Sequence, residues 1–228
     1  MEDLIQENTV LSAAQKEVLR HLPQTIRESF VFSGGTALAA FHLHHRQSED
    51  LDFFALRQDT PVRGDELEHA LGQVFTVRDS GRIFDRRLFR LDLGEMVKVE
   101  FAPLYWPRLG DPLQMAGLQV EALPDLAANK ILAISDRFDV KDFVDVFCIA
   151  RATGWTVAEM IELAYRKHPA RYEYQVHLSR IREHREAVRL LRMLRPLDGA
   201  SLVAFFEREE EQLIRREVDI EEDRDSSS

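Results

Sequence analysis

The sequence contains one cysteine and no long apolar run. Because Cys148 is the only cysteine among 228 residues, no disulfide can form within the chain, and a buried thiol in a reducing compartment is expected. No apolar segment approaches the ~18 residues that a membrane-spanning helix needs, and residues 1–8 carry acids where a signal peptide would be basic. We therefore expect a cytoplasmic protein without a membrane partner.

An excess of basic residues is also missing. The formal net charge is −10, which argues against a protein that coats nucleic acid through bulk electrostatics, since such domains are strongly basic. The charge is uneven, because residues 207–225 hold ten acids and four arginines, so the remainder can still carry a local basic patch. With 45% hydrophobic and 31% charged residues, the composition is that of a globular protein and excludes a fibrous or wholly disordered chain.

The first part of the chain mixes the periodicities of helices and strands. The spacing of apolar residues and the positions of glycine and proline predict helices at 4–22, 36–43 and 61–71. Alternating or β-rich segments predict strands at 29–33, 50–56, 76–78, 87–93 and 96–101. This order predicts a mixed β-sheet flanked by helices.

The rest of the chain has a helical pattern. Helices are expected at 124–137, 141–152, 156–167 and 176–195. Residues 217–228, which are acidic and end in three serines, are expected to be disordered. The fold class is therefore α+β, with a mixed part at 1–122, a helical part at 123–216 and an acidic tail at 217–228.

Three acids are candidates for chemistry. Asp50 and Asp52 are two residues apart on a predicted strand, so both carboxylates project from one face, where a cation between them would lower their repulsion. Glu100 projects from the polar face of another strand, beside Lys98. Carboxylate oxygens suit Mg²⁺ or Mn²⁺. The alternatives are solvent-facing acids on ordinary strands and an exposed Lys98–Glu100 pair.

The segment Gly34-Gly35-Thr36 joins a predicted strand to a predicted helix. Backbone N–H groups at such a helix N-terminus can bind phosphate, and the helix then leads the chain back to the strand with Asp50 and Asp52. The alternative is a tight turn that needs glycine only for its backbone angles.

These residues belong to a pattern that resembles a known family, the AbiEii/AbiGii-type nucleotidyltransferase toxins. The first motif is similar at 32–38 and 45–54, the second at 97–101, and the third and fourth at 125–130, Ala133, Arg137 and 141–145. All matches occur in the family's order. This sequence departs from the family in having Glu100 where Asp is frequent, and in a short helical part.

The resemblance implies a nucleotidyltransferase fold like that of DNA polymerase β, with motifs three and four in the helical part. It implies Asp50, Asp52 and Glu100 as metal ligands for Mg²⁺ or Mn²⁺. It also implies nucleotide contacts at Gly34, Gly35, Thr36, Arg46, Ser48 and Lys130, and a functional acid at Asp145. Structural alternatives stay open: a solvated Lys130, a helix-dipole role for Asp142, and an ion pair of Asp145 with Arg137 or Lys141.

The resulting function is transfer of a nucleoside monophosphate from an NTP to an acceptor hydroxyl. The resemblance further implies a toxin with an antitoxin protein partner, and tRNA as an acceptor. Arginines between 180 and 195 form a stripe that suits an RNA backbone, and the favoured alternative is a solvated amphipathic helix that offsets the acidic tail. Two other functions remain open: nucleotidylylation of a protein or small molecule such as an aminoglycoside, and a degenerate module that binds nucleotide or a partner without chemistry.

Overall fold

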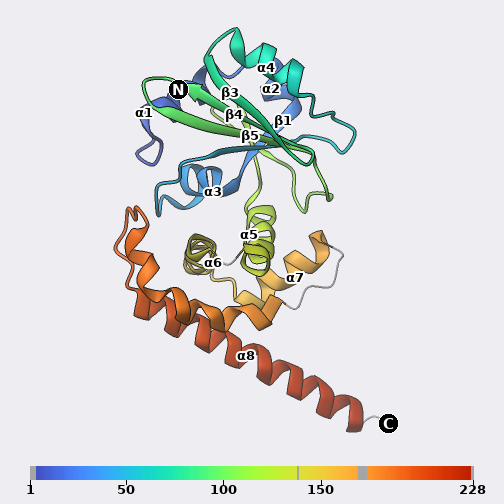
Figure 1. Cartoon of the computed structure of the whole chain (residues 1–228). Helices are drawn as coiled ribbons and strands as arrows, with labels where there is room; N and C mark the ends of the chain where they lie inside the picture. The colour runs from blue at the N-terminus through green and yellow to red at the C-terminus, as the bar shows by residue number, and fades with distance from the viewer. Residues whose placement is uncertain (1–3, 138, 169–173, 227–228) are drawn as a thin grey trace. The chain divides into compact units, whose positions relative to one another are not determined.

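The computed structural model describes the backbone of residues 4–137, 139–168 and 174–226. The chain divides into two compact units, Met1–Leu126 and Ala127–Ser228, shown from blue to red along the chain in Figure 1. Within the described ranges, no helix has both the length and the apolar character needed to cross a membrane.

The first unit is built on a mixed sheet of seven strands, in the order β3-β4-β5-β2-β1-β7-β6. The strands are β1 (Phe30–Ser33), β2 (Leu51–Ala55), β3 (Thr76–Ile83), β4 (Arg86–Asp92), β5 (Met96–Ala102), β6 (Leu113–Met115) and β7 (Leu118–Val120). The pairs β2/β5 and β1/β7 are parallel, and the other neighbours are antiparallel. The α+β class with a mixed sheet is confirmed. The short strands β6 and β7 have no counterpart in the sequence prediction.

Helices of the first unit are α1 (Ala13–His21), α2 (Gln24–Ser29), α3 (Gly34–Ala37), the π-helical turn η1 (Leu38–Leu43) and α4 (Gly64–Gly72). The helix predicted from residue 4 begins only at Ala13. Ser12 caps α1 by accepting a hydrogen bond from the backbone N–H of Gln15, whose side chain accepts one from the Ser12 N–H in return. This capping box sets the start of the helix.

A row of phenylalanines forms the centre of the sheet's buried face. Phe32 on β1, Phe53 on β2 and Phe101 on β5 are paired side by side, with ring centroids 5.1 Å and 5.3 Å apart. Successive residues of a strand point to opposite faces. The neighbouring positions Ser33, Asp52 and Glu100 therefore share the other face, so the buried row determines where the polar row lies.

The second unit is helical. It contains most of α5 (Leu123–Arg137), then α6 (Val140–Thr153), α7 (Val157–Lys167), the 3-10 helix η2 (Tyr174–Leu190) and α8 (Gly199–Ser226). Helix α8 was not predicted, and it includes residues 217–226, where a disordered tail was expected. Its first turns pack through Phe206, whose ring lies 5.2 Å from that of Phe143 on α6. Glutamate and arginine are good helix formers, so a helix anchored there can continue into the acidic segment.

Candidate functional site

Two of the three predicted metal ligands are neighbours in the sheet. Asp52 on β2 is paired with Glu100 on the parallel strand β5, and on its other side with Ser33 at the end of β1. Side chains at paired positions point to the same face. Asp50 lies two residues before Asp52, one residue ahead of the start of β2. The first unit therefore brings Asp52 and Glu100 together in one polar row.

The glycine turn packs directly against these acids. Gly34 has φ +70°, and a Cβ added there would lie 2.8 Å from Asp52 Cγ. A Cβ at Gly35 would lie 2.7 Å from Arg46 Nη2 and 3.2 Å from Ser48 Oγ. Close approach of these side chains therefore requires glycine at both positions, and it places the turn beside Asp52.

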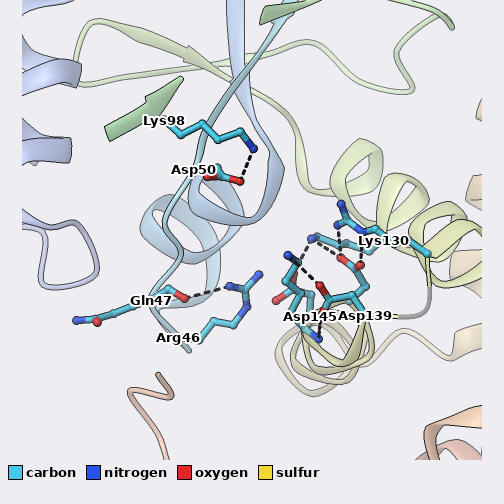
Figure 2. A network of polar contacts seen from close by, with 10 residues as sticks. Arg46, Gln47, Asp50, Lys98, Lys130, Asp139 and Asp145 are labelled. Carbon is cyan, nitrogen blue, oxygen red and sulfur yellow. Dashed lines mark hydrogen bonds and ion pairs between the residues drawn. The ribbon is translucent and has the colours of Figure 1, made fainter. Parts of the chain in front are cut away.

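The start of α3 is tied to the acid strand by Thr36, whose hydroxyl donates to the Asp50 carbonyl at 2.5 Å. Predicted nucleotide residues Arg46 and Ser48 lie in the loop before β2. Arg46 is buried and its Nη1 donates to the Gln47 carbonyl at 3.0 Å, as Figure 2 shows. Nε2 of Gln15 donates to the carbonyls of Ser48 and Glu49 at 2.8 Å and 3.0 Å, so α1 holds this loop.

Two cations accompany the acids. Lys98 Nζ lies 3.0 Å from Asp50 Oδ2 and 3.8 Å from Glu100 Oε2, and Figure 2 shows the first contact. Arg86 Nη1 lies 2.5 Å from Glu100 Oε1. Partial burial lowers the pKa of Lys98, but its hydrogen bond and charge interactions with Asp50, and the charges of Glu100 and Asp52, raise this pKa overall. Lys98 is therefore an ammonium ion at neutral pH, and its charge offsets that of the acids.

The chemical type of the acidic side chains suits a divalent cation. Asp50, Asp52 and Glu100 offer carboxylate oxygens on one face, the ligands that Mg²⁺ and Mn²⁺ prefer. In the part of the chain that the structure describes, no three Asp, Glu, His or Cys side chains are gathered closely enough to hold a metal ion. The Lys98 ammonium, in contact with Asp50 and Glu100, provides the positive charge there.

Sequence reasoning missed Glu121, which extends the polar row. Val120 on β7 is paired with Phe32 on β1, so Glu121 comes opposite Ser33, and the Ser33 hydroxyl donates to Glu121 Oε2. Both residues are buried. The row thus runs Glu100, Asp52, Ser33, Glu121 across four strands. Only the pairing of β7 reveals it, because residues 113–120 carry no clear strand pattern.

The second unit holds the remaining predicted site residues in a buried ion-pair cluster. Lys130 on α5 is 5% exposed, and its Nζ lies 2.8 Å from Asp142 Oδ1 and 2.7 Å from Asp145 Oδ2 on α6. Arg137 also binds Asp142 with two hydrogen bonds of 2.8 Å and 2.9 Å. Figure 2 shows Lys130 beside Asp145. Lys130 is thus not a solvated lysine, and Asp145 is paired with Lys130, a contact that the sequence analysis did not anticipate.

The arginines between 180 and 195 are partly engaged in ion pairs. Arg182 Nε lies 2.7 Å from Glu207 Oε1 on α8, and Arg189 Nη1 lies 2.9 Å from Glu186 Oε2. The side chain of Arg185 lies outside the described residues. The contacts of Arg182 and Arg189 favour a solvated, salt-bridged helix over a stripe reserved for RNA.

The close packing of Gly34 on Asp52 makes a testable prediction. Gly34→Ala should lower the free energy of unfolding by at least about 1 kcal/mol, because alanine at positive φ is strained and its Cβ would press on Asp52. Urea unfolding measures the change. Gly72→Ala is the matched control, since nothing lies within 4 Å of a Cβ there, and it should be neutral or stabilising. Equal effects of both substitutions would contradict the packing argument.

Comparison with known proteins places this arrangement in a family. A crystal structure from H. pylori, described as a candidate nucleotidyltransferase, is similar with a TM-score of 0.62 at 17% identity, over 92% of this chain and 98% of that one. The crystal structure of JHP933 from Helicobacter pylori has a TM-score of 0.55 at 15% identity, with the same coverage. These two likenesses show the fold.

Sequence comparison adds a relative and a family. An uncharacterized protein of Aquifex aeolicus, aq_aa25, is 29% identical over 161 residues, which cover 69% of this chain and 76% of that protein. The profile of the family described as nucleotidyl transferase AbiEii toxin, type IV toxin-antitoxin system, matches residues 17–219. This match includes the glycine turn, the acid row and the buried ion-pair cluster. The chain therefore belongs to the AbiEii nucleotidyl transferase toxin family.

Proposed function

We propose that this protein transfers a nucleoside monophosphate from an NTP to an acceptor hydroxyl, with Mg²⁺ or Mn²⁺ as cofactor. The observation that carries the proposal is the packing of the Gly34-Gly35 turn on Asp52, which is itself paired with Glu100. A helix N-terminus that offers backbone N–H groups to phosphate lies beside carboxylates, the oxygen ligands that divalent cations prefer. Phosphoryl-group transfer needs these two elements side by side.

Each proposed residue has a role in the transfer. The backbone of Gly34, Gly35 and Thr36 binds the phosphates, and Arg46 and Ser48, whose side chains would meet a Cβ at Gly35, support this binding. The acceptor hydroxyl attacks the α-phosphorus, a new P–O ester bond forms, and the bond to the β-phosphate oxygen breaks. Pyrophosphate leaves, and a carboxylate of the polar row takes the hydroxyl proton.

Asp50, Asp52 and Glu100 would hold the divalent cation. When bound, it would supply Lewis-acid activation of the attacking hydroxyl and neutralise charge on the phosphates. Lys98 contacts Asp50 and Glu100, so its ammonium would compete with a divalent cation for these carboxylates. Exchange of this ammonium for a divalent cation is therefore part of the proposal.

The proposed role of Lys130 is to contact the triphosphate. A primary ammonium on a flexible stem can follow negative charge as it moves to the leaving pyrophosphate. Asp145 would act as a positioning residue, because it contacts Lys130 Nζ at 2.7 Å. Asp142 accepts hydrogen bonds from both Lys130 and Arg137, which favours a structural role for this acid.

For the acceptor we propose tRNA, and for the biological setting a cytoplasmic toxin that an antitoxin protein restrains. The family is described as a type IV toxin-antitoxin system, which supports the antitoxin partner. The tRNA acceptor rests on the family resemblance of the sequence motifs.

The experiment that tests the proposal is incubation of the full chain with each α-labelled NTP, Mg²⁺ or Mn²⁺ and total tRNA, followed by gel separation. Label on tRNA that disappears with EDTA is the expected result. Label on a protein or on an aminoglycoside instead would favour the alternative acceptors. No label with any acceptor, together with retained nucleotide binding, would favour a binding module without chemistry.

Lys98→Met tests the exchange of cations without measuring activity. Removal of the ammonium leaves the acids without their neighbouring positive charge, so affinity for Mn²⁺ should rise by about tenfold at neutral pH. Calorimetric titration with Mn²⁺ measures it. Arg57→Met, in an exposed pair with Asp59, is the control and should bind Mn²⁺ like the wild type. Unchanged or weaker Mn²⁺ binding by Lys98→Met would contradict the exchange.

A further inference from the structure

The hairpin of β3 and β4 ends in an exposed aromatic tip. Ile83 is paired with Arg86, so Phe84 and Asp85 alone form the turn. Phe84 is 88% exposed and Ile83 is 53% exposed. Single exposed apolar residues are common on protein surfaces. The exposure of Phe84 is therefore informative only together with its backbone and its neighbours.

The backbone of Phe84 is unusual for its residue type. Its φ is +54°, and Asp85 is not among the residues with positive φ. Two-residue hairpin turns with positive φ at the first position favour glycine there, because a side chain is strained. The backbone conformation of the turn therefore does not explain why phenylalanine is at this position. An exposed, strained residue suggests a contact with another molecule.

Basic residues surround this tip. Residues 76–92 contain five arginines and three aspartates and no lysine or glutamate, so the hairpin is positive in a chain of net charge −10. Arg78 and Arg90 are paired with Asp92 and Asp79. Nearer the tip, Arg82 donates through Nε to the Phe84 carbonyl, which holds its positive charge at the backbone of the turn.

A second aromatic residue is attached to the turn. The Tyr105 hydroxyl donates to Asp85 Oδ1 at 2.6 Å, and the Tyr105 ring lies 5.6 Å from that of Trp106. The tip also reaches the candidate site, because Arg86, the first residue of β4, contacts Glu100. An arginine next to the turn thus contacts a proposed metal ligand.

We propose that this tip, Phe84 with Tyr105 and Arg82, binds a single-stranded segment of the RNA acceptor. Aromatic side chains stack on bases without regard to sequence, and arginines contact the adjacent phosphates. The contact between Arg86 and Glu100 would bring the bound strand alongside the reacting groups. This inference rests on the proposed function, since it names the surface that receives its acceptor.

The test is fluorescence anisotropy of a short, mixed-sequence single-stranded RNA titrated with the full chain. Phe84→Ala should weaken binding by about tenfold, while Phe84→Trp should retain it, because loss of one stacked base costs about this much. Arg82→Gln should weaken binding and reduce its salt dependence by about one counterion. Ile83→Ala is the matched control, an exposed apolar neighbour without a ring, and should bind like the wild type.

The Phe84→Leu variant separates RNA stacking from protein docking. Leucine keeps the apolar surface and removes the aromatic face, so it should lose affinity as alanine does. Wild-type affinity in Phe84→Leu or Phe84→Ala would overturn the proposal, as would failure of the wild type to bind the RNA. Asp52→Ala should bind RNA like the wild type. If the wild type binds the RNA but transfers no label to any acceptor, the proposed function alone is rejected. If the wild type transfers label to another acceptor but does not bind the RNA, this inference alone is rejected.

Discussion

Asp52→Ala is expected to reduce nucleotidyl transfer by about a hundredfold to a thousandfold, the range seen when a group that stabilises transition-state charge is lost. Asp52 is central in the polar row, because it is paired with both Glu100 and Ser33 and lies against Gly34. Its removal takes away a proposed metal ligand and the side chain that backs the phosphate cradle. Initial rates of label transfer from an α-labelled NTP measure the loss.

The control for this prediction is Asp59→Asn, which removes an exposed acid that pairs with Arg57 beyond the end of β2. It should transfer label at the wild-type rate. Circular dichroism and thermal unfolding must show that Asp52→Ala is folded, since the substitution leaves space beside Gly34. A folded Asp52→Ala protein with wild-type activity would reject the assignment of Asp52 to the metal.

Lys130→Met is expected to lower the free energy of unfolding by about 3 kcal/mol, the largest effect on stability that we predict. Lys130 contacts both Asp142 and Asp145, whose side chains are fully buried. Loss of the ammonium leaves the two acids with Arg137 as the remaining cation of this four-residue cluster. Uncompensated buried charge is costly because the surrounding protein solvates it poorly. Urea unfolding of the full chain measures the change.

Lys141→Met provides the matched control on α6. Lys141 is 38% exposed and pairs with Asp139, which is also partly exposed, so its removal should change stability by less than about 1 kcal/mol. If both lysine variants lose a similar free energy of unfolding, burial does not determine how much the Lys130 ion pairs stabilise the protein. A loss of NTP binding by Lys130→Arg, with stability retained, would further support contact with the triphosphate.

Much of the fold could be predicted from local patterns. The alternation in 96–101 predicted both the strand β5 and its buried face, and Val97, Val99 and Phe101 are buried. The spacing of Asp50 and Asp52 predicted a shared face, and the glycine pair predicted the turn between β1 and α3. The predictions failed where local signals were short or ambiguous, at β6 and β7, or where packing overrode composition, at α8.

The candidate site was predictable only in part. The sequence motifs indicated Asp50, Asp52, Glu100, Lys130 and Asp145, but not Arg86 or Glu121. Arg86 meets Glu100 because β4 pairs with β5, and Glu121 contacts Ser33, which lies 88 residues earlier in the sequence. Such contacts depend on which strands become neighbours, and no local period of the sequence encodes that choice.

By itself, the sequence determined the family, the α+β class, the single-face placement of Asp50 and Asp52, and the glycine turn that precedes them. The family follows from the resemblance of the sequence motifs, and the other features follow from periodicity and backbone preference, which act over a few residues. The tertiary structure alone decided that Asp52 is paired with Glu100, that Lys98 and Arg86 offset the acids, and that Lys130 is buried between Asp142 and Asp145. The reason is physical: charge and burial depend on every neighbour in space, and those neighbours are assembled by strand order and helix packing.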